Sequence, residues 1–386
     1  MTHIAINAQL VSFASSYRNA GVSRYTYTLL EALSRVDDDL TCTAFINAQE
    51  AIPAAASQLG KSPRIRLVPS RWSTSSAARR ILWEQLDLPG QARRSGAQVF
   101  HAPVNVLPER MSLPSIVTIH DLAFVRYPEF FKPSRRIYQR IFTERSARRA
   151  AAIIADSEAT RQDIISTFHI SPNRVRVIYP SVSPDFRPEP DPARLAAFRA
   201  RHNLPPRYLL YMGTLEPRKN LVTLVEAYAQ MLSGDPSTPP LILAGAKGWY
   251  YQPLYERVRA LGLERNVTFA GYVSREEQAL WYAGAALFLY PSLYEGFGLP
   301  VVEALACGIP TITSTVSSLP EAGGPVALQT PPDDARALAR AMRDAIADPA
   351  LPDRVRVEGP RWTRRFSPEQ MAWQYVNMYA AVAGGA

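Results

Sequence analysis

The stretch Glu295-Gly-Phe-Gly-Leu-Pro-Val-Val-Glu303 decides the fold, because it joins a buried strand to a helix through a glycine-bearing turn. The apolar run 286–290 before it predicts the strand, and Gly296 and Gly298 allow the backbone to turn tightly. Pro300 suits the first helical position, where a missing N–H is harmless. A buried strand, a tight turn and a helix in this order are typical of parallel α/β proteins.

The two carboxylates of this stretch predict a ligand site. Glu303 follows within the first turns of the helix and Glu295 hangs from the preceding loop, so both side chains can reach one crevice. The amides at a helix start favour an anion, and carboxylates accept hydrogen bonds from sugar hydroxyls. The pattern therefore predicts a nucleotide-sugar site, with Gly296, Phe297, Gly298 and Leu299 beside the donor.

A second glycine-bearing turn, Gly213-Thr-Leu-Glu-Pro-Arg-Lys-Asn220, follows another apolar run and precedes a helical pattern that Asn220 would cap. Arg218 and Lys219 lie beside the positive end of that helix. A cation at this position destabilises the helix by a few tenths to about 1 kcal/mol. An anion such as a pyrophosphate compensates both cations most simply. The alternative is an Arg-Lys pair that is only solvated.

Short apolar, β-branched runs alternate with helical patterns along the whole chain, which predicts an α/β fold with two doubly wound, Rossmann-like sheets. The proline-rich stretch from Pro180 to Pro206 disfavours regular structure and predicts a linker. The predicted domains are residues 1–185 and 207–366, with a linker at 186–206 and an amphipathic helix at 367–382. The predicted strands are 3–10, 42–47, 64–69, 97–102, 115–120, 151–156 and 174–179, then 208–213, 240–245, 266–271, 286–291, 310–314 and 325–329.

Several polar residues follow these strands. Ligands of open α/β sheets bind outside the carboxyl ends of the strands, so an active site is expected in a cleft between the two domains. His120 can donate a hydrogen bond to a sugar hydroxyl or a leaving phosphate, or bond only to neighbouring backbone. Gly21 lies in the loop after the first strand, where backbone amides can approach the donor. Tyr272 and Val273 follow another strand, where the nucleotide base is expected, and Lys247 either approaches a phosphate or is solvated.

The composition is that of an ordinary folded chain of 386 residues, of which 47% are hydrophobic and 20% charged. This length accommodates two cores. No apolar run approaches the roughly 18 residues of a membrane span, and the first residues predict a strand in place of a leader, so a cytoplasmic protein is expected. Cys42 and Cys307 are too few for a disulfide framework or a cysteine zinc site. Metalloprotease and P-loop motifs are absent, and no metal or other cofactor is expected.

The basic surplus lies in the first half: residues 1–190 contain 24 Lys and Arg against 16 Asp and Glu, whereas residues 191–386 contain 19 against 18. A basic amphipathic helix can lie on an anionic membrane or gather an anionic acceptor, or it is simply a solvated face. Nucleic-acid binding is disfavoured, because no groove-reading motif accompanies the charge. Much of the surplus falls on one predicted helix with Arg135, Arg136, Ile137, Arg140, Ile141, Arg145, Arg148 and Arg149.

The sequence resembles the retaining GT-B glycosyltransferases of family 4, in particular their mannosyltransferase-like members, through six elements in the family's order. The E-x7-E signature at 295–303 is one of them, and the turn at 213–220 is another. One pair of glutamates arises by chance in many helices, but six ordered elements do not. The other four are Arg24-Tyr-Thr-Tyr27, His120-Asp-Leu122, Gly245-Ala-Lys-Gly-Trp249 and Glu321-Ala-Gly323.

The resemblance implies a retaining transfer of a hexose from a nucleoside diphosphate to a hydroxyl of a glycan or lipid-linked saccharide in bacterial surface polysaccharide synthesis. GDP-mannose is the preferred donor, and no metal is required. The fold it implies is GT-B, two Rossmann-like domains facing a central cleft. It also implies that helix 367–382 packs back on the N-terminal domain.

The resemblance assigns roles residue by residue. Lys219 and Arg218 would hold the diphosphate, Glu295 and His120 the transferred sugar, and Glu303 the ribose. Glu295, His120 and Lys219 are thereby the implied catalytic residues. Gly21 and Gly213 would approach the donor. The chain departs from the family pattern at Thr214, where many members carry an arginine, so that Arg218 or another basic residue would compensate. It also departs at Ala20, where many members carry glycine.

Three alternatives stay open. The enzyme could use a UDP-sugar and transfer glucose, galactose or N-acetylglucosamine. It could be a sugar-nucleotide epimerase or a glycogen-type synthase on the same scaffold, and a product formed without acceptor would indicate the epimerase. The chain could also be a non-catalytic GT-B subunit that stabilises an active partner, which turnover by the purified chain would exclude.

Overall fold

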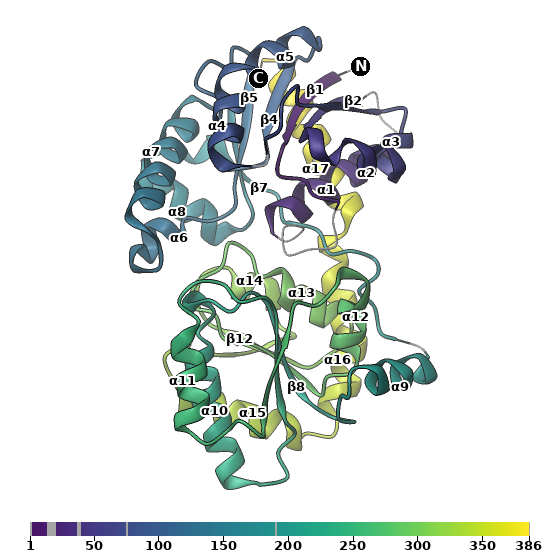
Figure 1. The fold of residues 1–386 in the computed structure, drawn as a ribbon, viewed down its shortest axis with the longest axis vertical. Helices are drawn as coiled ribbons and strands as arrows, with labels where there is room; N and C mark the ends of the chain where they lie inside the picture. The colour runs from purple at the N-terminus through teal and green to yellow at the C-terminus, as the bar shows by residue number, and fades with distance from the viewer. Residues whose placement is uncertain (1, 14–20, 37–39, 75, 190, 386) are drawn as a thin grey trace. The chain divides into compact units, whose positions relative to one another are not determined.

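The computed structural model describes residues 2–13, 21–36, 40–74, 76–189 and 191–385 (Figure 1). The chain forms two compact units, one of Met1–Ser181 with Pro368–Ala386 and the other of Val182–Ser367. Each unit is a parallel sheet flanked by helices on both faces. This arrangement confirms the predicted α/β class with two doubly wound sheets.

The sheet of the first unit has the strand order β3-β2-β1-β4-β5-β6-β7, and every neighbouring pair is parallel. Its central strands are buried on both faces, as the apolar run Ile4-Ala-Ile6 shows. The strands are β1 Thr2–Ala8, β2 Leu40–Ile46, β3 Ile65–Pro69, β4 Val99–Ala102, β5 Ser115–Ile119, β6 Ala152–Ala155 and β7 Val175–Val177.

The sheet of the second unit repeats the scheme with the order β10-β9-β8-β11-β12-β13. Its strands are β8 Leu209–Met212, β9 Leu241–Ala244, β10 Val267–Gly271, β11 Leu287–Tyr290, β12 Thr311–Ser314 and β13 Leu328–Thr330. Each of the thirteen predicted strands overlaps an observed one. Both sheets reverse their order at one point, between β1 and β4 in the first and between β8 and β11 in the second, and ligands of such sheets bind at these points.

Helices connect the strands and cover both faces of each sheet (Figure 1). The first unit contains α1 Val22–Arg35, α2 Ala51–Ala56, α3 Gln58–Lys61, α4 Ala77–Leu86, α5 Leu88–Arg94, α6 Ala123–Arg126, α7 Pro133–Arg149, α8 Glu158–Phe168 and α17 Pro368–Ala383. The second contains α9 Pro192–Arg201, α10 Leu221–Gly234, α11 Gln252–Ala260, α12 Arg275–Ala283, α13 Leu299–Ala306, α14 Leu319–Gly323, α15 Ala335–Ala347 and α16 Leu351–Thr363.

The C-terminal helix α17 completes the core of the first unit. Its buried face carries Met371, Tyr375 and Tyr379, which join the cluster formed by β1, β2 and α1. A second cluster with Trp83 and Phe100 lies among the side chains of α4, α5 and β4. The C-terminal helix α17 is therefore part of the first, N-terminal unit.

The prediction that 186–206 lacks regular structure is wrong, because α9 occupies residues 192–201. Pro192 begins this helix, and the carboxylate of Asp191 accepts a hydrogen bond from the backbone N–H of Ala193 at 2.9 Å. Proline is favoured in the first turn of a helix and disrupts only its interior. The proline density therefore marks a helix start here as well as an irregular connection.

Candidate active site

The switch point of the second sheet brings together the two glycine-bearing turns that the sequence singles out. The turn at 213–220 follows β8, and Glu295 follows β11, the neighbouring strand. Lys219 and Glu295 are both only 7% exposed. Residues more than 70 positions apart thus share one buried cluster of charged groups.

Lys219 lies at the centre of this cluster. Its Nζ donates to Glu295 Oε1 at 2.6 Å and to the Tyr290 hydroxyl at 2.9 Å. An ammonium group has three N–H donors, so these two contacts leave one for a further oxygen. Lys219 is therefore held in a fixed position and retains the capacity to bind a ligand.

Arg218 bridges two carboxylates. Its Nη1 donates to Glu295 Oε2 at 3.0 Å and to the carbonyl of Tyr294 at 2.8 Å, while Nη2 donates to Glu216 Oε1 at 2.9 Å. Two cations thus face two carboxylates, and charge-assisted hydrogen bonds of this kind are the strong ones in proteins. Glu216 lies within the turn 213–220, but the sequence analysis did not predict its ion pair with Arg218.

Glu295 is ionised at neutral pH despite its burial. Burial raises the pKa of this carboxyl, but the charges of Arg218 and Lys219 outweigh it and lower the pKa to about 2. The loop that carries Glu295 is held by serines: its N–H donates to Ser317 Oγ at 3.0 Å, and Ser318 Oγ donates to its carbonyl at 2.9 Å. The result is a preorganised acceptor for hydroxyl groups.

Glu303 belongs to a different hydrogen-bonded group. It lies on α13, is 4% exposed, and accepts a hydrogen bond from the Tyr282 hydroxyl at 2.9 Å. The structure thus buries both predicted glutamates in one unit and gives them different partners. The Tyr282 contact fixes one carboxylate oxygen of Glu303.

The turn between the two glutamates differs in detail from the prediction. Gly298 has φ +102°, a conformation that favours glycine, and directly precedes α13. Gly296 does not adopt a positive φ, and Pro300 is the second helical residue instead of the first. The Phe297 ring packs edge-on against Phe366 at 5.1 Å, so its side chain contributes to the core.

Asn220 does not cap α10 through its side chain as the sequence predicts. It precedes the helix in the left-handed region, with φ +58°, and no side-chain bond to the first helical amides forms. Its amide instead donates to the carbonyls of Pro291 at 3.2 Å and Pro332 at 2.6 Å. Asn220 therefore ties the turn after β8 to the loops after β11 and β13.

Glycines bring the ends of three strands of the second unit, β8, β9 and β10, close to one another. Gly213 donates to the carbonyl of Ala244, and Gly245 donates to that of Gly271 at 2.7 Å. A Cβ at Gly245 would lie 1.8 Å from the Gly213 carbonyl oxygen. Beyond Gly271, Tyr272 is 44% exposed and Val273 is buried.

Replacing Gly245 by alanine is expected to destabilise the second unit by about 3 kcal/mol or more, because backbone must move to admit the methyl group. Gly262→Ala is the matched control: its φ is +65°, but its Cβ would meet no atom within 4 Å, so only about 1–2 kcal/mol of backbone strain is expected. Urea unfolding measures both. Equal losses in the two variants would contradict the close approach.

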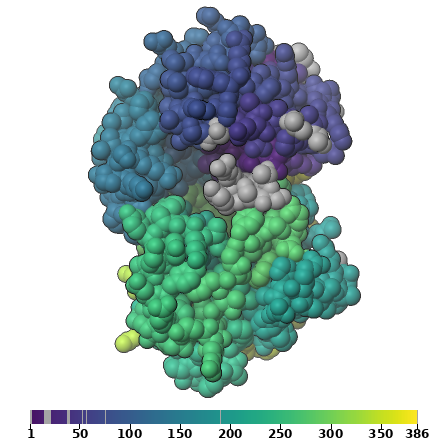
Figure 2. All heavy atoms as spheres, in the orientation of Figure 1, coloured from purple at the N-terminus to yellow at the C-terminus, as the bar shows by residue number. Residues whose placement is uncertain are grey.

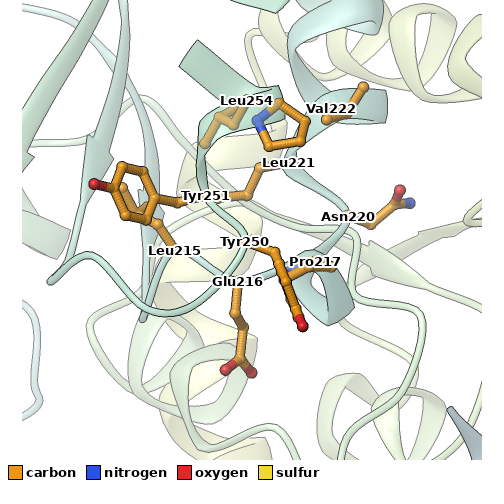
Figure 3. A pocket seen from close by; sticks show the side chains of 10 residues that line it. Leu215, Glu216, Pro217, Asn220, Leu221, Val222, Tyr250, Tyr251 and Leu254 are labelled. Carbon is orange, nitrogen blue, oxygen red and sulfur yellow. The ribbon is translucent and has the colours of Figure 1, made fainter. Parts of the chain in front are cut away.

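A pocket of about 180 Å³ lies beside this region (Figure 3). Its lining is mainly apolar and includes Leu215, Leu221, Tyr251 and Leu254. Figure 3 shows the Glu216 carboxylate pointing away from Leu221 and Leu254. Arg218 and Lys219 do not line this pocket, but Glu216, the partner of Arg218, does, so the pocket adjoins the charged cluster.

Lys247 is exposed and also lies beside two aromatic rings. Its Nζ lies 5.2 Å from the ring centroids of both Tyr251 and Tyr255, a cation–π arrangement, and Tyr255 stacks on Phe269. The sequence prediction left a phosphate contact or solvation open. The aromatic pair is a third environment that the sequence reading missed.

His120 follows β5 in the first unit, and both of its ring nitrogens have partners. Nδ1 lies 2.8 Å from Asp156 Oδ2, and Nε2 lies 2.9 Å from the carbonyl of Pro103. Burial opposes the charged ring, but Asp156 and the carbonyl raise the pKa of His120 above its ordinary value. Because both nitrogens face acceptor oxygens, the geometry favours the imidazolium. The sequence reading missed Asp156.

The loop before α1 is only partly described. Gly21 has φ +56° and precedes the helix, as expected for a residue that must turn the backbone. Arg18 and Ala20 lie outside the described residues. Tyr25, on the first turns of α1, packs edge-on against the His120 ring at 4.7 Å.

A buried polar network connects this region to α17. The Tyr25 and Tyr375 hydroxyls are hydrogen-bonded to each other, and the Tyr375 hydroxyl lies 3.3 Å from Thr118 Oγ1. His101 bonds to Thr118 at 2.9 Å and to Tyr379 at 2.8 Å, and burial lowers its pKa to about 3, so it is neutral. His101 is therefore a core residue.

Tyr375→Phe is expected to lower the free energy of unfolding of the first unit by about 1–3 kcal/mol, because it leaves the Tyr25 hydroxyl buried without this partner. The matched control is Trp373→Phe, on the same helix but 63% exposed, which is expected to change stability by less than about 0.5 kcal/mol. Thermal and urea unfolding measure both. A neutral Tyr375→Phe would contradict the importance of the network.

Three further observations concern metal ions, membrane-spanning helices and cysteines. Among the described residues, no group of three or more His, Cys, Asp and Glu side chains could hold a metal ion. Within the same part of the chain, no helix combines the length and apolarity needed to cross a bilayer. Cys42 and Cys307 are both buried free thiols.

The two doubly wound parallel sheets form the GT-B fold. Residues 195–362 match the family model described as Glycosyl transferases group 1, and residues 19–186 match Glycosyltransferase Family 4. O-antigen chain mannosyltransferase B of Escherichia coli is 33% identical over 282 residues, which are 73% of this chain and 74% of that protein. The chain belongs to the family 4 glycosyltransferases.

Other relatives agree with this assignment. The serotype-specific mannosyltransferase WbdA of Escherichia coli is 31% identical over 57% of this chain but only 27% of its own length. Sucrose-phosphate synthase of Thermosynechococcus elongatus has a TM-score of 0.78 at 24% identity, with both chains fully covered. HepE of Anabaena, in complex with UDP and glucose, has a TM-score of 0.74 at 18% identity over 99% of this chain and all of that one. At these identities the two structures show the fold alone.

Proposed function

We propose that this glycosyltransferase transfers mannose from GDP-mannose, with retention of configuration, to a hydroxyl of a glycan or lipid-linked saccharide in bacterial surface polysaccharide synthesis. The observation that carries the proposal is the buried Lys219–Glu295–Arg218 cluster at the switch point of the second sheet. The relatives named as O-antigen mannosyltransferases support the choice of sugar and product.

The cluster suits the departure of a nucleoside diphosphate. Negative charge grows on the leaving diphosphate as the glycosidic bond breaks, and preorganised cations stabilise it. Lys219 offers its third N–H, and Arg218 lies beside it, so the two side chains would supply the charge that a metal supplies in other enzymes. The enzyme is therefore proposed to be independent of metals.

The remaining groups bind the rest of the donor in this proposal. Ionised Glu295 accepts hydrogen bonds from hydroxyls of the transferred sugar, and Glu303, with one oxygen fixed by Tyr282, accepts those of the ribose. The exposed ring of Tyr272 stacks on the base.

Calorimetric titration of the purified chain with GDP-mannose, GDP, UDP-glucose and UDP tests the proposal, first in EDTA and then with magnesium. Selective binding of the guanine nucleotides in EDTA is expected. Arg336→Gln, on α15 of the second unit, serves as a control. This variant should bind the nucleotides as the unmodified chain does. Binding that needs magnesium contradicts the metal-independent part of the proposal.

A UDP-sugar is the second candidate donor, because HepE was solved in complex with UDP, with UDP and glucose, and with UDP-glucose. Selective binding of UDP in the same titration would support the proposed role of the charged cluster. It would also show that the base of the donor is uracil and remove the support for GDP-mannose. Binding of none of the four compounds would favour a non-catalytic subunit.

A further inference from the structure

Helix α7 carries six arginines and one glutamate, and the two halves of the helix differ in how these charges are paired. In the C-terminal half, Arg148 pairs with Glu144 at 2.8 Å and Arg149 pairs with Glu109 at 3.2 Å. In the N-terminal half, the side chains of Arg135, Arg136 and Arg140 form no ion pair with any described residue. The unpaired charge is therefore concentrated in the first turns.

The same turns expose branched aliphatic side chains. Ile137 is 54% exposed and Ile141, one turn later on the same face, is 46% exposed. Arg140 follows Ile137 by three positions and shares that face. The buried residues of α7 are Thr143, Ser146 and Ala147, all in the C-terminal half, so the N-terminal half packs little against the unit.

Helix α4 repeats the combination nearby. Leu82 is 47% exposed and Leu86 59%, and exposed Arg79 precedes them by one turn. The two helices are linked through Glu109: its backbone N–H donates to Gln85 Oε1 of α4 at 2.8 Å, and its carboxylate pairs with Arg149 of α7 at 3.2 Å. Figures 1 and 2 show α7 at the outer surface of the first unit.

We propose that the arginines and aliphatic residues on the N-terminal half of α7 and on α4, together called the α4–α7 surface, dock on an anionic lipid bilayer. A solvated helix face accounts for the arginines but not for four exposed aliphatics, which are four of the five most exposed large apolar side chains among the described residues up to 181. A second copy of the same surface would bring arginines against arginines. An anionic bilayer offers phosphates to the arginines and acyl chains to the aliphatics.

Each basic residue near such a membrane strengthens binding by about fivefold, and each buried aliphatic group adds to it. The α4–α7 surface consists of eight exposed residues and the partly buried Arg136; the eight are Arg79, Leu82, Leu86, Lys132, Arg135, Ile137, Arg140 and Ile141. Neutralising three of its arginines is therefore expected to weaken binding by about 100-fold. The proposal goes beyond the transfer reaction and does not depend on which sugar is moved.

Cosedimentation of the full chain with vesicles tests the proposal. The chain is expected to bind vesicles of phosphatidylglycerol and phosphatidylcholine and to ignore vesicles of phosphatidylcholine alone. The variant R135Q/R136Q/R140Q should bind about 100-fold more weakly. The variant I137S/I141S should keep its salt-sensitive binding but lose the binding that resists high salt.

The matched control is R336Q/R340Q/R343Q, which removes three exposed arginines from α15 in the second unit and should bind vesicles as the unmodified chain does. Equal weakening of both triple variants would overturn the proposal, since it would show only a dependence on net charge. So would binding to an acidic polymer such as heparin without binding to vesicles. Nucleotide titration of the same samples separates this test from that of the transfer reaction.

Discussion

Turnover by Lys219→Ala is expected to fall by about 10²- to 10³-fold, because the variant loses a preorganised cation that stabilises developing charge on the leaving diphosphate. The effect should appear mainly in kcat, since a group that acts on charge formed during bond breaking contributes most in the transition state. Initial rates of donor consumption over a range of donor concentrations measure it.

The control for this prediction is Lys61→Ala, which removes an exposed lysine from α3 and should leave the rate unchanged. Magnesium should not restore the activity of Lys219→Ala if the site works without metal. A variant that keeps more than about a third of the normal turnover would remove Lys219 from the catalytic machinery.

Glu295→Gln is expected to destabilise the second unit by about 3–5 kcal/mol at neutral pH, because it leaves Lys219 and one contact of Arg218 without their buried carboxylate. The pKa of Glu295 in the folded chain, about 2, lies below the ordinary value of about 4.3. Its stabilisation is therefore complete above about pH 4.3 and is lost as the pH falls through 2.

The free energies of unfolding of the unmodified chain and of Glu295→Gln should consequently converge as the pH falls across that window. Urea unfolding at several pH values measures this. Glu277→Gln is the matched control, since Glu277 takes part in surface ion pairs with Arg201 and His202 and should cost less than about 1 kcal/mol. A loss at Glu295→Gln that does not change between neutral and acid pH would contradict the buried ion pairs.

The sequence predicted the fold, and it predicted that Lys219 and Glu295 lie near one another, because both depend on local patterns. Short apolar runs that end in glycine or a polar residue define parallel strands, and polar residues at the ends of strands at a switch point must lie together. Lys219 and Glu295 were found in this way. Gly298 was found because a turn into a helix demanded its positive φ.

Partners chosen by tertiary packing could not be predicted. Nothing near Arg218 in the sequence indicates that Glu295 binds its guanidinium, and nothing near His120 indicates Asp156, since these contacts depend on how strands and loops meet. The helix at 192–201 was missed because proline is read as a breaker, although it is also a common first residue of helices. The network between Tyr25 and Tyr375 joins residues 350 positions apart.

The most direct test of the central claim is to incubate the purified chain with GDP-mannose and a mannose-terminated oligosaccharide in EDTA, and to analyse the product by NMR. The account predicts a mannosylated oligosaccharide whose one-bond C1–H1 coupling shows the α-configuration of the donor. A β-linked product would contradict retention. Absence of transfer by a chain that binds GDP-mannose, with all mannose-terminated acceptors tried, would contradict the assignment as a mannosyltransferase.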